Sequence, residues 1–133
     1  MIISEIELPI HTVSEANQRG QDWRPKAARV KSQRAAAMLV MRTVGPKLPA
    51  CFRVTLTRVS PLPLDSDNLA GALKAVRDGV ASSWGVDDGS SLIEWRYAWE
   101  KGPPRSVRAG KESYSVRMRV EDLRADARGE AVA

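Results

Sequence analysis

The chain has 133 residues, 43% of them hydrophobic, and a net charge of +5. This length and composition fit one domain with a single core and exclude a chain that is disordered by composition. The single cysteine and the single histidine exclude an intrachain disulfide and a zinc site made of His and Cys, and they argue against a nucleophilic Cys-His or Ser-His site.

The first half of the chain predicts a strand, a helix and a second strand. Residues 2–8 alternate loosely between apolar and polar side chains and stop at Pro9, which indicates a short strand. Residues 24–43 are rich in Ala, Met, Lys and Arg, which favour a helix, although its apolar stripe is imperfect. Residues 51–58 alternate again and predict a half-buried strand.

The second half predicts one helix and two strands. Residues 67–83 have the apolar spacing of an amphipathic helix, and either Asp65 or Asp67 can cap its N-terminus. Residues 90–99 and 113–120 alternate strongly and are joined by a loop. We expect these last two strands to be antiparallel neighbours in the sheet.

The predicted order β-α-β-α-β-β indicates an α+β fold, in which two helices pack on one face of a four-stranded mixed sheet. We expect one domain over residues 1–123 and a flexible tail over residues 124–133, because the tail is small, charged and aperiodic. No apolar run is long enough to span a membrane, and residues 1–5 lack the pattern of a secretory signal. We therefore expect a cytoplasmic protein with no membrane partner.

Basic residues are unevenly distributed along the chain. The first 60 residues contain ten Lys and Arg against four Asp and Glu, whereas residues 61–133 contain eleven against twelve. A basic half beside an acidic half predicts a polyanion as partner, although a high isoelectric point is also common in small proteins. The candidate contacts to DNA phosphates are Arg24, Lys26, Arg29, Lys31, Arg53, Arg96, Arg117 and Arg119.

Two acidic clusters flank the second predicted helix. The first contains Asp65, Asp67 and Asn68, and the second is Asp87 and Asp88. Neighbouring carboxylates repel each other, and a divalent cation is the commonest reason to collect them. The alternatives are a helix cap for the first cluster and a turn for the second.

Together, the two clusters resemble the motifs of the RusA family of Holliday-junction resolvases, which are small dimeric endonucleases encoded by phages and prophages. The likeness rests on the D-x-D-N motif, the later Asp pair and the strand that follows them, and it covers about residues 50–100. The resemblance implies that Asp65, Asp67 and Asp88, together with Asp87, bind Mg²⁺, with Mn²⁺ as an alternative. It implies no small-molecule cofactor.

The chain departs from the family at one position of the helix. The family often has a Lys four residues after the second motif Asp, where this chain has Gly71. Lys74 lies one turn further along, on the same helical face as Asp67, and is the candidate that takes over contact with the scissile phosphate. The alternative is a solvated surface lysine, since the rise from Asp67 to Lys74 is about 10 Å.

The helix between the two clusters is about 20 Å long, so the clusters meet within one chain only if residues 82–88 double back or the helix stops early near Gly79. The alternative is a site that a second subunit completes. The resemblance implies Mg²⁺-dependent cleavage of four-way DNA junctions, with paired nicks from a symmetric homodimer in a bacterial cytoplasm. One alternative is a related protein that binds branched DNA without cutting it, which the missing lysine favours. A more distant alternative is a protein-interaction module.

Overall fold

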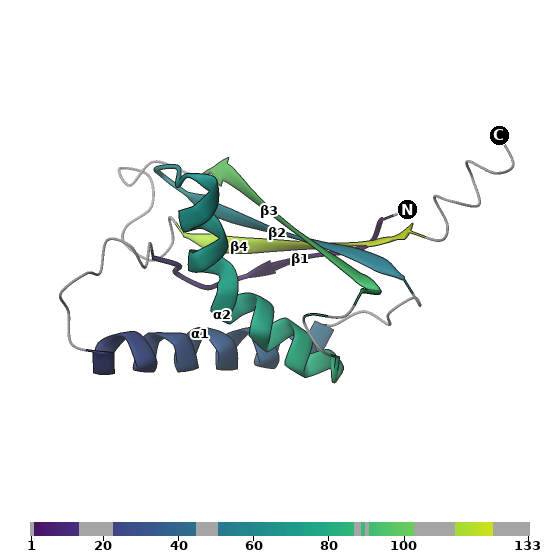
Figure 1. Ribbon diagram of the computed structural model, residues 1–133, viewed down its shortest axis with the longest axis horizontal. Coiled ribbons are helices and arrows are strands. Elements are labelled where there is room, and N and C mark those ends of the chain that lie inside the picture. Colours follow the sequence, from purple (N-terminus) through teal and green to yellow (C-terminus); the bar gives the residue numbers. More distant parts are fainter. Residues whose placement is uncertain are drawn as a thin grey trace, which may run out of the picture.

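The computed structural model describes residues 2–13, 23–44, 51–86, 89, 91–102 and 114–123. Its elements are β1 (Ile2–Leu8), α1 (Trp23–Val44), β2 (Phe52–Ser60), α2 (Ser66–Trp84), β3 (Ile93–Lys101) and β4 (Ser115–Asp122) (Figure 1). The predicted order β-α-β-α-β-β is confirmed, and the limits of each element lie within a few residues of the predicted ones. The predicted tail over residues 124–133 lies outside the described residues.

The four strands form one mixed sheet in the order β1-β4-β2-β3. β2 and β3 are parallel, and β4 lies antiparallel between β2 and β1. The expectation that β3 and β4 are neighbours was wrong, because β2 lies between them. The helical crossover through α2 makes β2 and β3 parallel neighbours, and the connection after β3 is long enough to pass one strand before β4 begins.

Both helices lie on one side of the sheet, as predicted, and leave its other face open (Figure 1). α2 packs on β2 and β3, whereas α1 packs mainly on α2 and touches the sheet at β1. The outer side of α1 and the open face of the sheet are therefore on opposite sides of the molecule. No helix among the described residues combines the length and the apolarity that crossing a bilayer requires.

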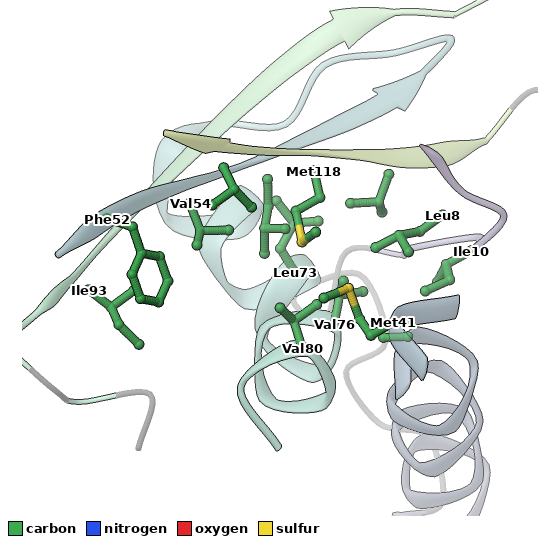
Figure 2. Close-up of a cluster of buried hydrophobic side chains, with 14 of the residues drawn as sticks. Leu8, Ile10, Met41, Phe52, Val54, Leu73, Val76, Val80, Ile93 and Met118 are labelled. Atoms are coloured by element: carbon green, nitrogen blue, oxygen red, sulfur yellow. The ribbon is translucent and has the colours of Figure 1, made fainter. Parts of the chain in front are cut away.

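The core fills the layer between the sheet and the helices. Figure 2 shows side chains from the strands, from α2 and from Met41 of α1 gathered in this layer. The apolar stripe predicted for the second helix is buried along its whole length. Its members are Leu69, Ala72, Leu73, Val76 and Val80. The helix is therefore held mainly by its apolar face, as expected for an amphipathic helix on a sheet.

The stripe of α1 is interrupted by a polar residue. Ala37 and Met41 are buried, but Gln33 occupies a core position between them and the N-terminal end of the helix, with 7% of its surface exposed. Its Nε2 donates a hydrogen bond of 3.0 Å to the backbone oxygen of His11. This bond satisfies a buried amide and ties α1 to the segment that follows β1.

Candidate functional site

Asp65 is the N-cap of α2. Its backbone is extended (φ −66°, ψ 167°), and its Oδ1 accepts a hydrogen bond of 3.0 Å from the backbone N–H of Asn68. The helix-cap interpretation of this residue is confirmed, and the cap is Asp65 rather than Asp67. One carboxylate oxygen of Asp65 is engaged in the cap, and the side chain is exposed.

Asp67 is the second residue of the helix and is also exposed. The two carboxylates thus lie within the same first turn, at the positive end of the helix dipole. This turn stands beside the edge where the parallel strands β2 and β3 end (Figure 1). Within the described residues, no group of three or more His, Cys, Asp or Glu side chains comes together to hold a metal.

Asp67 heads a stripe of residues along α2. Gly71, Lys74 and Asp78 follow it at spacings of four, three and four residues, which place all four on one helical face. The last three line a cavity of about 330 Å³ between α1 and α2, and Lys26 of α1 lines the same cavity. Because Gly71 has no side chain, the stripe is open between the carboxylate of Asp67 and the amine of Lys74.

The second acidic cluster follows the opposite end of α2. Gly85 ends the helix with a left-handed φ of 67°, and the backbone N–H of Val86 bonds to the oxygen of Ala81 at 3.1 Å. A helix of 19 residues is about 28 Å long, so Val86 is far from Asp65. Asp87 and Asp88 themselves lie outside the described residues.

A buried arginine joins the segments around the acidic turn. Arg58, at the end of β2, is 6% exposed. Its Nε donates to Thr12 Oγ1 at 2.8 Å, and its Nη1 donates to Ser60 Oγ at 2.7 Å and to the oxygen of Leu62 at 3.2 Å. These bonds connect the segment after β1 to the turn that leads into Asp65.

The charge of Arg58 is met by neutral groups among its described contacts. The oxygens of Thr12, Ser60 and Leu62 accept its hydrogen bonds, and the ring of Tyr114 lies 5.7 Å from the guanidinium carbon. Burial lowers the pKa of Arg58, and its electrostatic interaction with Tyr114 opposes that shift. Sequence reasoning missed this role, although strand alternation places Arg58 on the buried side with Leu56.

Four of the predicted DNA-contacting arginines lie on the open face of the sheet. Every one of them is paired with a glutamate of a neighbouring position or strand. The pairs are Arg53 with Glu94 and Glu121, Arg96 with Glu94, Arg117 with Glu5 and Glu100, and Arg119 with Glu5. A phosphate at this face would compete with carboxylates that are already in place.

The other predicted contacts lie on α1. Lys26 and Lys31 are exposed, and Arg29 is half-buried. Arg24 belongs to the same helix, but its side chain is outside the described part of the chain. The predicted DNA-binding set is thus divided between two surfaces on opposite sides of the molecule.

No protein-family model matches the chain, and no curated protein matches it either. The resemblance to RusA-like resolvases therefore stays a prediction that rests on the motif residues of the sequence.

Proposed function

We propose that this protein is a metal-dependent endonuclease that cuts four-way DNA junctions as a symmetric dimer. The proposal rests on the acidic turn that contains Asp65 and Asp67. From this turn, one face of α2 leads to the cavity that Lys26 and Lys74 line. Carboxylates beside lysines are the groups that hold a divalent cation and the phosphate it acts on. Sites in parallel strand-helix-strand units commonly lie at the carboxyl ends of the strands, where this turn stands.

The donor set of the acidic turn fits Mg²⁺. Both carboxylates are exposed, and only one oxygen of Asp65 is used by the helix cap. Mg²⁺ is held by one or two carboxylates and keeps waters and phosphate oxygens as its other ligands. When bound, such an ion lowers the pKa of a bound water and offsets charge on the reacting phosphate.

The roles of the chain's own residues follow from their positions. Asp65 and Asp67 would hold the cation, and the helix N-terminus would add its dipole toward a phosphate. Lys74 would contact a phosphate oxygen from inside the cavity, and Lys26 would do so from α1. Arg58 would position the acidic turn through its bonds to Ser60 and Leu62.

The second acidic cluster would act in the partner subunit. Because Val86 follows the C-cap of α2, about 28 Å from Asp65, we propose that Asp88 of one copy completes the site of another. A two-fold axis would then build two equal sites, as paired nicks in a four-way junction require. Mixing inactive Asp67→Asn protein with inactive Asp88→Asn protein should restore part of the activity, since mixed dimers contain one intact site.

The central test is cleavage of a synthetic four-way junction in Mg²⁺. Asp67→Asn should lower the cleavage rate by about 100-fold or more, while junction binding is retained. Asp65→Asn is a second variant that removes the charge but keeps the helix cap, because Asn caps a helix as well as Asp does. Glu7→Gln on β1 is the matched control and should cut normally. Equal cleavage by Asp67→Asn and wild type would exclude this site.

A second candidate function is binding of branched DNA without cleavage, which Gly71 favours because it stands where related enzymes often have a lysine. A Cβ atom at position 71 would meet nothing within 4 Å, so the backbone there accepts a residue with a side chain. If the wild type binds junctions but does not cut them in Mg²⁺ or Mn²⁺, Gly71→Lys should introduce cleavage. Wild-type cleavage would rule this candidate out.

A further inference from the structure

We infer that the outward face of α1 binds the phosphate backbone of the nucleic acid, and that the open face of the sheet does not. The inference rests on the proposed function for the identity of the polyanion and assigns the surface that holds it. It divides the predicted contacts into those of α1 and those of the sheet, and it adds Arg42 of α1, which sequence reasoning did not include.

The first support is the composition of α1. Its 22 residues contain six Lys and Arg and no Asp or Glu. Among its described side chains, Lys26, Lys31, Arg34 and Arg42 are exposed. The described hydrogen bond of Arg34 goes to the hydroxyl of Ser82, at 2.9 Å. Because a hydroxyl is neutral, this bond does not offset the positive charge of Arg34. A helix with this charge attracts a polyanion along its whole length, which is about 33 Å.

The second support is the shape of the outward face. Ala28, Lys31, Ala35 and Arg42 follow one another at spacings of three, four and seven residues, which place them on one side of the helix. This side is opposite to the buried Gln33. The exposed alanines leave room for a partner to approach the helix backbone between the two charges, which are about 16 Å apart along the axis.

The third support is the contrast with the open face of the sheet. There, Arg53, Arg96, Arg117 and Arg119 are matched by Glu5, Glu94, Glu100 and Glu121. A phosphate backbone gains affinity by releasing its counterions to unpaired cations. Arginines that are already held by carboxylates offer little of this gain, and the carboxylates themselves repel phosphates.

Nucleic acid fits this face better than an anionic membrane does. Helices that lie in a membrane surface present bulky apolar residues opposite their basic side. The apolar side of α1 is used in the core, through Ala37 and Met41. On its outer side, Leu39 is the exposed large hydrophobic residue, with 67% of its surface accessible.

The test compares two double variants that each remove two exposed positive charges. One is Lys31→Gln with Arg42→Gln on α1, and the other is Arg96→Gln with Arg119→Gln on the sheet. Binding of a labelled four-way junction and of a duplex is measured by fluorescence anisotropy in EDTA over a range of salt concentrations. Far-UV circular dichroism and thermal melting confirm that both variants are folded.

We expect the α1 variant to bind about ten-fold more weakly at 0.1 M salt, and its slope of log K against log salt to fall by about 2. The sheet variant should stay within about three-fold of wild type. Ala35→Lys, which adds a charge between Lys31 and Arg42, should tighten binding. Equal losses in both variants, a larger loss in the sheet variant, or no change with Ala35→Lys would overturn the inference.

Binding in EDTA tests the surface without the metal, and junction cleavage is measured separately in Mg²⁺, so the two proposals can fail independently. Protein that binds DNA through α1 but never cuts a junction supports the inference and contradicts the nuclease. Protein that cuts junctions with an α1 variant of unchanged affinity overturns the inference alone. Binding to vesicles of phosphatidylserine and phosphatidylcholine, without binding to DNA or RNA, would also overturn it.

Discussion

The two faces of the sheet differ in the groups that contact their charged side chains. On the open face, charged side chains alternate in sign and pair across strands, as Arg53 does with Glu94 at 2.9 Å. On the covered face, the strands present apolar side chains to the helices, and Arg58 is the charged residue among the buried ones described there. It is held by neutral oxygens rather than by a carboxylate.

This difference shows that a basic residue in this chain cannot be assigned a role from its charge alone. The open-face arginines are partly exposed to water and matched by glutamates, so we expect their contribution to stability to be small. The buried arginine has lost its hydration, and its hydrogen bonds fix the segments that it joins. We propose the exposed Lys31 and Arg42 of α1 as contacts for a polyanion.

The largest expected effect comes from exchanging the two arginines of β2 for methionine. Arg58→Met leaves buried oxygens of Thr12 without their donors, and we expect it to lower the free energy of unfolding by about 2–4 kcal/mol. Arg53→Met removes partly exposed ion pairs and should cost less, about 1 kcal/mol. Urea denaturation measures both. Equal losses would mean that the two faces do not differ as described.

An intermediate effect is expected from replacing two glycines of α2 by alanine, because Gly79 packs against α1 and Gly71 is exposed. A methyl group at Gly79 would stand 2.6 Å from the backbone oxygen of Arg34 in α1, so Gly79→Ala should destabilise the fold by about 1–3 kcal/mol. Gly71 is open, and Gly71→Ala should stabilise the helix by about 0.5–1 kcal/mol. Unfolding midpoints in urea should move in opposite directions. A stabilising Gly79→Ala would contradict the close packing of α1 on α2.

The smallest effect is a pH dependence on the open face. Hydrogen bonds from Arg96 and Arg53 hold the pKa of Glu94 below its ordinary value. A carboxyl group with a lowered pKa stabilises the folded state above its unfolded-state pKa of about 4.3 and loses that contribution as the pH falls through its folded-state pKa. The difference in melting temperature between wild type and Glu94→Gln should therefore shrink from neutral pH to about pH 3. Glu7→Gln is the control, and a constant difference for Glu94→Gln would contradict the pairing.

Much of the fold could be predicted from the sequence, because its signals are local. The apolar spacing over residues 67–83 predicts the buried side of α2, and the alternation over residues 51–58 predicts which side of β2 faces the core. The neighbours of each strand could not be predicted in this way. The position of β4 between β1 and β2 depends on contacts with strands that are distant in the chain, which no local pattern indicates.

The candidate site was predicted in part. The sequence indicated that Asp65 and Asp67 come together beside a helix, and the structure places both in the first turn of α2. It did not indicate the cavity that joins this turn to Lys74, because the cavity needs α1 to cross α2. Nor did it indicate that Arg58 stabilises the turn, since some of the oxygens that accept its hydrogen bonds lie on Thr12, far away in the chain.

The sequence by itself determined the elements, their order and the basic character of α1, because side-chain spacing and helix or strand preference act over a few residues. The tertiary structure alone decided which charges are neutralised. Pairing across strands joins Arg119 to Glu5, more than a hundred positions away, while no acidic residue within α1 can neutralise Lys31. Charge pairing acts through space, so the basic side chains that are matched by glutamates could be identified only once the sheet and the helices were assembled.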